Sequence, residues 1–235
     1  MLIWQTVRFK LMTNKSLSSY VFILCAPIKF FLVSTIIFFE IYHFNDVFSE
    51  EIQESPEKII SEITGGILEE IKNDPDLAAG DWIKINKLVD EKVMPVIDFE
   101  KMTSMAVGKY WRTASTDQKN TLMKTFRELL VLTYSGAIRF ADKADMKILP
   151  PRRNPTDIDA VVRTRVTVPG RQPVPIDYRL RKTDMGWRIF DLNVLGLWLI
   201  ENYRTQFSQI ISRNGIEGLI SAIDSKNKSL LQSKK

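Results

Sequence analysis

The order of the predicted elements indicates an α+β fold, with helices first, then a small antiparallel sheet, then helices again. Two changes of pattern support this prediction. Apolar residues recur at helical spacing from about residue 55 to 141, form short β-rich runs from 145 to 194, and return to helical spacing after 199. No internal repeat interrupts this order. We therefore expect one domain over residues 50–235, preceded by a segment of a different kind over residues 1–49.

Residues 1–49 have the pattern of a secretory signal. The segment opens with basic residues and no acid, continues with a mostly apolar run over residues 20–39, and gains acids only afterwards. Its uninterrupted apolar part, residues 30–39, is shorter than the roughly 20 residues that cross a bilayer. We predict export, with cleavage between Ser49 and Glu50. An uncleaved N-terminal anchor and a buried N-terminal helix are the alternatives.

The first helix of the domain is predicted from its start signal and its apolar stripe. Ser55 is a typical capping residue, and Pro56 suits the first helical turn. Isoleucines then recur at four-residue spacing, at Ile59, Ile63, Ile67 and Ile71. A turn over residues 73–80 is expected to end this part of the chain.

Three more helices are predicted before the sheet, over about residues 81–93, 99–112 and 116–141. Pro95 stops the first of these, because proline cannot continue a helix. The longest opens at Ser115, and Gln118 three residues later completes a capping-box pattern.

About four strands follow, over residues 145–149, 160–168, 174–182 and 187–194. Short connections rich in turn residues join the last three, which predicts antiparallel hairpins. In the third strand Ile176, Tyr178 and Leu180 alternate with charged residues, so one face of the sheet should be buried and the other wet. Two helices, about 199–213 and 216–226, are expected to close the domain, followed by a polar tail.

Composition excludes several kinds of catalytic centre once residues 1–49 are removed. The chain has one Cys and one His, and Cys25 and His43 both precede residue 50. The remaining domain therefore lacks the residues of Ser-His-Asp and Cys-His enzymes, the usual zinc ligands and any disulfide. It also contains no glycine-rich phosphate loop.

Catalysis by carboxylates has little support in the sequence. The candidates Asp98, Glu100, Asp177 and Asp191 come from different elements, each with Lys or Arg nearby, and solvated ion pairs are the simpler interpretation. We predict that the protein is not an enzyme and uses no cofactor. The whole chain has a net charge of +5, and without residues 1–49, which hold four basic and two acidic residues, it is +3, mildly basic. This charge suits anionic lipid surfaces or acidic protein faces, not nucleic acid.

An ordered series of short motifs begins at residue 96. It runs through Val96-Ile97-Asp98-Phe99, Ala106-Val107-Gly108-Lys109-Tyr110-Trp111-Arg112, Pro173-Val174-Pro175-Ile176-Asp177-Tyr178, Gly186-Trp187, Asp191-Leu192-Asn193-Val194, Asn202-Tyr203-Arg204-Thr205-Gln206-Phe207 and Gly215-Ile216-Glu217-Gly218-Leu219-Ile220. In order and spacing, this series resembles the MlaC family, also called the toluene-tolerance or phospholipid-binding ABC transporter auxiliary proteins. The resemblance covers about residues 55–231.

The resemblance implies a soluble periplasmic carrier of glycerophospholipid. Such a carrier works between an outer-membrane lipoprotein–porin complex and an inner-membrane ABC transporter with an MCE-type lipid-binding subunit, and it maintains outer-membrane lipid asymmetry. The family fold packs helices on a curved antiparallel sheet and places the acyl chains in an apolar cavity between them. A membrane-tethered small-molecule-binding or structural envelope protein is the alternative.

Large apolar side chains at inward positions are our candidates for the cavity wall. From the strands they are Val162, Val166, Tyr178, Leu180 and Phe190, and from the helices Phe99, Met102, Phe126, Leu130 and Tyr134. Arginines also alternate along two of the strands, at Arg163, Arg165, Arg179 and Arg181. They could attract phosphate or an acidic partner, but a solvated strand face is the simpler interpretation.

Overall fold

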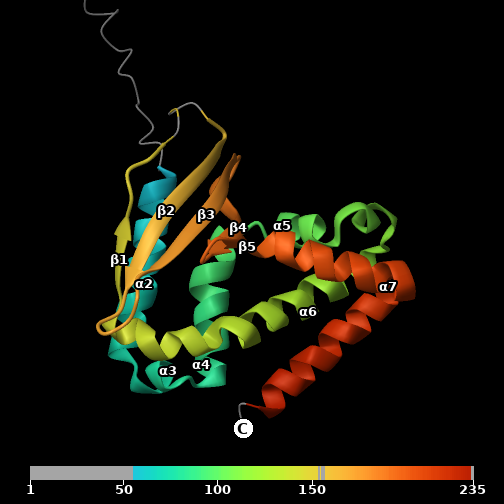
Figure 1. Ribbon diagram of the computed structural model, residues 1–235, viewed down its shortest axis with the longest axis horizontal. Coiled ribbons are helices and arrows are strands. Elements are labelled where there is room, and N and C mark those ends of the chain that lie inside the picture. Colours follow the sequence, from blue (N-terminus) through green and yellow to red (C-terminus); the bar gives the residue numbers. More distant parts are fainter. Residues whose placement is uncertain (1–54, 153, 155–156, 234–235) are drawn as a thin grey trace, which may run out of the picture. The chain divides into compact units, whose positions relative to one another are not determined.

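The structure is a computed structural model that describes residues 55–152, 154 and 157–233 (Figure 1). The predicted secretory segment or anchor, residues 1–49, lies outside the described residues. Within the described ranges, no helix is both long and apolar enough to cross a membrane. The elements follow the predicted order of helices, sheet and helices, so the α+β class is confirmed.

The first helix, α2 (Pro56–Asn73), begins where its capping signal predicted. The Ser55 hydroxyl accepts a hydrogen bond from the backbone N–H of Lys58 at 3.1 Å. Its isoleucine stripe divides between two neighbours, because Ile59 and Ile63 pack against the sheet while Ile67 and Ile71 pack against the next two helices. α2 lies behind the sheet in the view of Figure 1.

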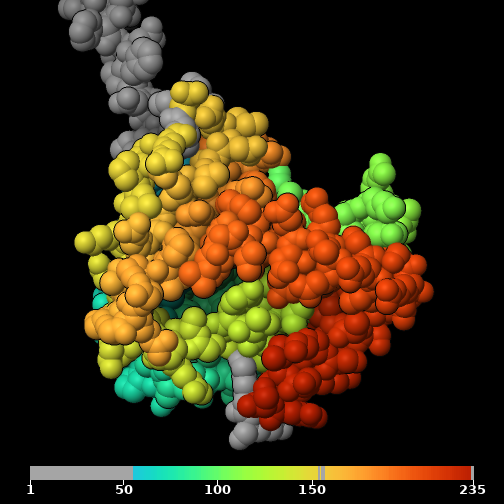
Figure 2. Space-filling view, in the orientation of Figure 1, coloured from blue at the N-terminus to red at the C-terminus, as the bar shows by residue number. Residues whose placement is uncertain are grey.

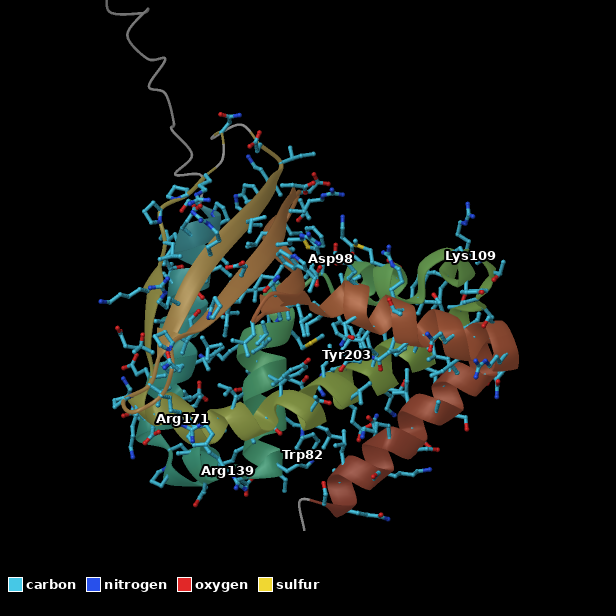
Figure 3. The ribbon with its side chains drawn as sticks, in the orientation of Figure 1. Trp82, Asp98, Lys109, Arg139, Arg171 and Tyr203 are labelled. Atoms are coloured by element: carbon cyan, nitrogen blue, oxygen red, sulfur yellow. The ribbon has the colours of Figure 1, made fainter. Side chains whose placement is uncertain are left out.

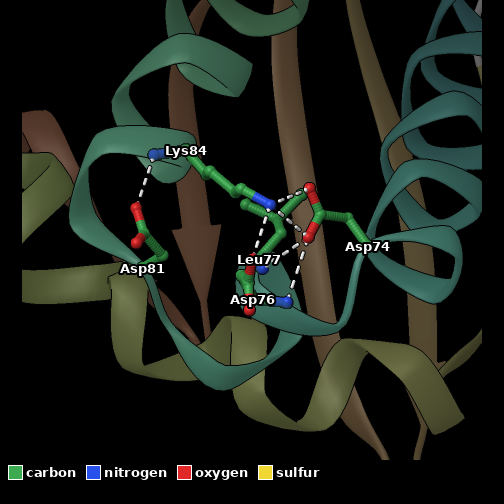
Figure 4. A network of polar contacts seen from close by, with 5 residues as sticks. All are labelled: Asp74, Asp76, Leu77, Asp81 and Lys84. Atoms are coloured by element: carbon green, nitrogen blue, oxygen red, sulfur yellow. Dashed lines mark hydrogen bonds and ion pairs between the residues drawn. The ribbon is translucent and has the colours of Figure 1, made fainter.

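A short helix, α3 (Pro75–Ala79), stands where a turn was predicted. The Asp74 carboxylate accepts hydrogen bonds from the N–H groups of Asp76 and Leu77, and this cap stabilises a single helical turn (Figure 4). The Lys84 ammonium group lies 2.8 Å from both Asp74 carboxylate oxygens and 2.9 Å from Asp76. These contacts lower the pKa of Asp74 and join α3 to the following helix.

The next helices are shorter than predicted. α4 (Trp82–Leu88) passes into a π-helical turn, η1 (Val89–Val93), and a 3-10 turn, η2 (Met94–Val96). α5 (Phe99–Val107) ends at Gly108, whose positive φ of 66° breaks the helix, and the 3-10 helix η3 (Gly108–Thr113) follows. The predicted α-helices over residues 81–93 and 99–112 were both too long, because the apolar pattern continues from the α-helix into the π-helical or 3-10 turn that follows it.

The longest predicted helix is two elements. α6 (Thr116–Tyr134) starts with the predicted capping box, in which the Ser115 hydroxyl accepts from the Gln118 N–H and the Gln118 side chain accepts from the Ser115 N–H. Beyond Tyr134 the chain tightens into the 3-10 helix η4 (Ser135–Lys143).

The sheet has five antiparallel strands in chain order: β1 (Asp145–Ile148), β2 (Asp159–Thr167), β3 (Val174–Thr183), β4 (Gly186–Val194) and β5 (Leu197–Trp198). The last strand has two residues, too few to show an alternation in the sequence. One register shift occurs where β3 pairs with β4, since Leu180 pairs with Ile189 but Arg179 pairs with Asp191. Phe190 is the extra residue of this bulge.

The two predicted C-terminal helices are two parts of one element, α7 (Leu199–Gln232), which bends at Gly215. Gly215 has φ 69° and ψ −175°, a conformation that glycine adopts without a Cβ clash. The helix continues six residues beyond the predicted end at Lys226.

Three apolar clusters form the core. The sheet cluster consists of Ile59, Ile60, Ala160, Val162, Leu180, Trp187 and Ile189. The helical cluster consists of Met102, Ala106, Val107, Leu122, Phe126, Leu129, Phe190, Leu199, Ile200, Tyr203, Phe207, Ile211, Leu219 and Ile223. A smaller cluster of Ile71, Leu77, Ile85 and Leu88 joins α2, α3 and α4.

Candidate functional site

The two faces of the sheet differ sharply in charge. The inner face, which packs against α2, carries from β2 to β4 the residues Ala160, Val162, Thr164, Val166, Ile176, Tyr178, Leu180, Trp187, Ile189, Leu192 and Val194. None of these side chains is charged, and the charged side chain at an inner-face position of these strands is Lys182, opposite Trp187 beside the β3–β4 turn. The outer face carries the arginines of the same strands, because side chains alternate along a strand. The predicted division into a buried face and a wet face is therefore present.

The inner face is covered unevenly along its length. Val162 and Leu180 are at most 1% exposed, with Ile59 and Ile60 of α2 packed against their cluster. At the other end of the same strands, Val166, Ile176 and Val194 are only half-buried. The space-filling view is hollowed between the strands and α6 (Figure 2). An uncharged apolar surface therefore extends from the packed core to an accessible end.

Tyr178 lies at the boundary between the packed and the half-covered parts. It stands on the central strand, opposite Val162 on β2 and Leu192 on β4. Burial raises the pKa of Tyr178, and hydrogen bonds with Thr164 and Thr64 oppose this rise. Its phenol group thus has polar partners in otherwise apolar surroundings, and it is the main polar feature of this part of the inner face.

The sheet cluster and the helical cluster meet at Ile97 and Leu192. Both residues are partly buried and pack against both clusters. The junction is held by the backbone, since the Asp98 N–H donates to the Ile189 carbonyl oxygen at 2.8 Å and Ile97 forms a bridge with Ile189. The inner face of the sheet and the interior between α5, α6 and α7 are thereby joined into one apolar region.

Aromatic rings form the centre of the helical part. The Phe126 ring centroid lies 5.9 Å from that of Phe99, 4.9 Å from that of Tyr203 and 5.2 Å from that of Phe207. Figure 3 shows Tyr203 between α7 and α6. Burial raises the pKa of Tyr203 to about 12, and the neighbouring Tyr134 adds to this rise. Phe126, Tyr203 and Phe207 are at most 7% exposed, so the ring cluster is a closely packed interior.

The structure distributes the ten predicted wall residues over these regions. Phe99, Met102, Phe126, Leu130 and Phe190 belong to or pack against the helical cluster, whereas Val162, Tyr178 and Leu180 belong to or pack against the sheet cluster. Val166 lies at the half-covered end of the inner face, and Tyr134 is 41% exposed at the end of α6. Most of the predicted residues therefore lie in or beside the joined apolar region.

Phe190 requires a correction, because we expected it to face inward with Tyr178 and Leu180. The bulge places it instead with Arg179 on the outer side, where its ring is 7% exposed, remains part of the helical cluster, borders a recess and lies 5.8 Å from the Arg181 guanidinium carbon. A strand that kept regular alternation would have given the predicted orientation. The bulge is set by pairing with β3, which no pattern within β4 reveals.

Several residues of the apolar region were not among the predicted ones. Ile176 shares the alternation of Tyr178 and Leu180 and was recognisable from it. Leu192 and Val194 can be assigned to the inner face only when the bulge in β4 is known. Ile97 can be assigned to the apolar region only when the contact between its segment and β4 is known. Tyr203 and Phe207 stand four residues apart on α7, which is the signal of a shared helix face.

No cluster of three or more His, Cys, Asp or Glu that could hold a metal ion occurs in the part of the chain that the structure describes. The fold and the site together define a class of protein: an α+β domain with a mainly apolar face between a sheet and helices, suited to an apolar ligand.

The comparisons with known proteins identify the family. Residues 61–225 match the sequence model of the family described as MlaC protein, so the chain belongs to the MlaC family and this prediction is confirmed. A solved structure described as a phospholipid-binding protein from Ralstonia solanacearum in complex with a phospholipid is 37% identical, with a TM-score of 0.72. That match covers 74% of this chain and 98% of the other chain.

A relative from Haemophilus influenzae named intermembrane phospholipid transport system binding protein MlaC is 23% identical over 174 residues. The matched region covers 72% of this chain and 77% of that relative.

Proposed function

We propose that the protein binds a glycerophospholipid, with its acyl chains along the inner face of the sheet and its head group at the half-covered end. The observation that carries this proposal is the inner face itself, uncharged from Ala160 to Val166 and open beside Val166, Ile176 and Val194. It is supported by the Ralstonia solanacearum relative, which has the same fold and is described as bound to a phospholipid.

The energetics of transfer favour a carrier without polar chemistry. Burial of two acyl chains avoids on the order of 20 kcal/mol of exposure to water, at about 0.8 kcal/mol for each CH2 group. A bilayer provides nearly the same shelter, so exchange between membrane and protein is close to balanced. A head group left at the opening keeps its phosphate in water and avoids the cost of burying a charge.

Of the predicted wall residues, Val166, Tyr178, Leu130 and Phe99 are the best placed to contact acyl chains. They are only partly buried and lie on or near the joined apolar region. Val162, Leu180, Met102 and Phe126 are closely packed and would form the back of the site. Tyr134 stands at the exposed rim, and Phe190 would contribute only through the helical cluster, because it lies on the outer side of the sheet.

The wider role in this proposal is that of a periplasmic shuttle that leaves its ligand chemically unchanged. It would exchange lipid with an inner-membrane ABC transporter carrying an MCE-type subunit and with an outer-membrane lipoprotein–porin complex, and so maintain outer-membrane lipid asymmetry. Family membership and the name of the Haemophilus influenzae relative support this role. Residues 50–235 would form the lipid-binding domain, and residues 1–49 the secretory signal or anchor.

Native mass spectrometry of the purified protein, followed by extraction and identification of the bound molecule, tests the binding proposal. We expect a mass increment equal to one phospholipid, which disappears after delipidation and returns on incubation with phospholipid vesicles. A protein that carries no lipid before and after incubation would contradict it. N-terminal sequencing of the protein from the cell envelope tests the processing proposal, for which a start at Glu50 is expected.

A further inference from the structure

The outer face of the sheet is mainly basic, and its side chains are exposed or half-buried along β1, β2 and β3 but buried at Phe190, Asp191 and Asn193 of β4. Its strand residues include six basic side chains, Lys147, Arg163, Arg165, Arg179, Arg181 and Arg188, against four acidic ones, Asp145, Asp159, Asp177 and Asp191. The yellow and orange strands are seen directly in Figure 2, without a helix over them. This surface lies on the opposite side of the sheet from the proposed lipid site.

Two of the four acidic side chains form ion pairs with arginines of the same sheet. Asp159 accepts two hydrogen bonds of 2.6 Å from the Arg181 guanidinium, in a bidentate pair. Asp191 is 1% exposed and bound to Arg179 at 3.1 Å. These pairs neutralise two of the arginines on β3. The positive charge that is left over belongs mostly to β1 and β2.

Arg163 and Arg165 have no carboxylate partner within the described part of the chain. The Arg163 guanidinium donates to the Pro150 carbonyl oxygen at 2.7 Å instead of pairing with Asp177, its cross-strand neighbour. Arg165 stands directly across from Lys147, and both side chains are exposed. Like charges in directly opposed positions destabilise a sheet, so this arrangement does not serve the fold.

A recess of about 480 Å³ lies beside Arg163. Val161 and the 7% exposed ring of Phe190 provide its apolar surface, and Arg152, Arg163, Arg179 and the Arg181-paired Asp159 provide charged groups around it. Val161 is 43% exposed, and the bulge at Arg179 brings Phe190 to this side. Asp157, which also borders the recess, accepts from the Asn154 N–H at 3.0 Å. The recess therefore combines an apolar floor with guanidinium groups at its border.

We propose that the outer face of the sheet is a docking surface for a protein partner that presents an acidic segment with interspersed apolar side chains. Carboxylates of the partner pair with Arg163 and Arg165, and an apolar side chain enters the recess over Val161 and Phe190. Charge complementarity of this kind speeds encounter and sets the orientation of the complex. Docking here leaves the opposite, lipid-carrying face of the sheet free, and it does not depend on which ligand that face binds.

The test uses a fluorescein-labelled 12-residue peptide of alternating glutamate and leucine, with a glutamine–leucine peptide as charge control. We compare the wild type with the double variant Arg163→Glu, Arg165→Glu by fluorescence anisotropy. The matched control is Lys124→Glu, Lys226→Glu, which makes the same change in net charge at exposed positions outside the sheet. We expect the arginine variant to bind the acidic peptide at least about tenfold more weakly, about 1.4 kcal/mol. The lysine variant should stay within about twofold of the wild type, and binding should weaken with added salt.

Equal losses in both double variants, or no binding of the acidic peptide by the wild type, would overturn the proposal. A second result would also overturn it: the protein binds phosphatidylglycerol vesicles through Arg163 and Arg165 but does not bind the acidic peptide. The outer face would then be a membrane contact. Amide chemical-shift mapping with the wild type gives a readout that does not rely on variants, and shifts confined to residues outside β2, β3 and β4 would also contradict it. Lipid occupancy by native mass spectrometry should be unchanged in both variants, which separates this test from that of lipid binding.

Discussion

The carboxylate of Asp191, buried on β4, accepts a hydrogen bond from the backbone N–H of Ile200 in the first turn of α7 at 3.1 Å. The same side chain accepts from the Leu192 N–H and pairs with Arg179, whose guanidinium carbon lies 3.7 Å from the centroid of the Trp198 ring. Trp198 precedes α7 and provides no side-chain cap of its own. Asp191 therefore supplies the missing cap and fastens α7 to the sheet.

Loss of this cap should weaken the junction between sheet and helix. We expect Asp191→Ala to lower the free energy of unfolding by about 2 kcal/mol, because it removes the acceptor and leaves buried donors unsatisfied. Asp191→Asn should cost less, since the amide oxygen still accepts from Ile200. Urea denaturation measures both. Asp184→Ala, at an exposed turn position, is the control, and a loss as small as that of the control would show that Asp191 does not fasten α7.

Asp159 and Asp191 should affect acid stability with opposite signs. Hydrogen bonding to Arg181 lowers the pKa of Asp159 below 3.8, so the ionised carboxylate stabilises the native state above the unfolded pKa and loses this effect as the pH falls through the native pKa. Burial raises the pKa of Asp191 above 3.8, so the native state holds this proton more tightly than the unfolded state. Its contribution to stability therefore falls as the pH rises from 3.8 through the native pKa.

Urea denaturation from about pH 3 to about pH 7 measures these effects. The advantage of the wild type over Asp159→Asn should shrink toward acid pH. The stability of the wild type relative to Asp191→Asn should instead decrease as the pH rises. Parallel pH profiles for the two variants would be incompatible with the opposite pKa shifts.

Phe126 should be the most sensitive aromatic residue of the helical cluster. It is 1% exposed and contacts three other rings, so Phe126→Ala removes those contacts and opens a cavity. We expect the free energy of unfolding to fall by about 3–5 kcal/mol. Phe140→Ala, at a residue that is 40% exposed with Arg171 over its ring, should cost less than about 1 kcal/mol. Comparable losses in thermal or urea unfolding would contradict the assignment of Phe126 to the centre of the core.

Glycines within two helices should respond to alanine in opposite directions. A Cβ at Gly65 on α2 meets no atom within 4 Å, so Gly65→Ala should raise stability by about 0.5–1 kcal/mol through helix propensity. A Cβ at Gly218 on α7 would lie 2.2 Å from the Cβ of Asn214, next to the bend at Gly215. Gly218→Ala should lower stability by about 1–3 kcal/mol. Differential scanning calorimetry distinguishes the two, and stabilisation by both substitutions would be inconsistent with the bend.

Adjacent residues of β2 give a sharp test of the proposed lipid site. Val166 lies on the half-covered inner face, whereas Thr167 is exposed on the outer face. We expect Val166→Trp to fill the space for the acyl chains and abolish phospholipid co-purification, and Leu130→Trp to do the same from α6. Thr167→Trp should retain its lipid. Native mass spectrometry gives the occupancy and circular dichroism checks the fold; full occupancy in a folded Val166→Trp would remove this residue from the site.

Local chemistry made much of the fold predictable. The starts of α2 and α6 followed from Ser55 and Ser115, because a cap is a contact between residues three apart in the chain. The two-residue period of β3 likewise separates Tyr178 from Arg179, since neighbouring side chains of a strand point to opposite faces. Helix ends were less predictable, since the passage of α4 into η1 and of α6 into η4 leaves the apolar pattern unchanged.

The sequence by itself determined the order of elements, the absence of His and Cys after residue 50, and the family to which the chain belongs. Only the tertiary structure decided which apolar side chains are packed and which lie open. Val162 and Val166 are indistinguishable in the alternation of β2, yet α2 covers one and leaves the other half-exposed. Phe190 changed face because its pairing with β3 contains a bulge. Burial and register depend on contacts between distant segments, so a pattern within one segment cannot specify them.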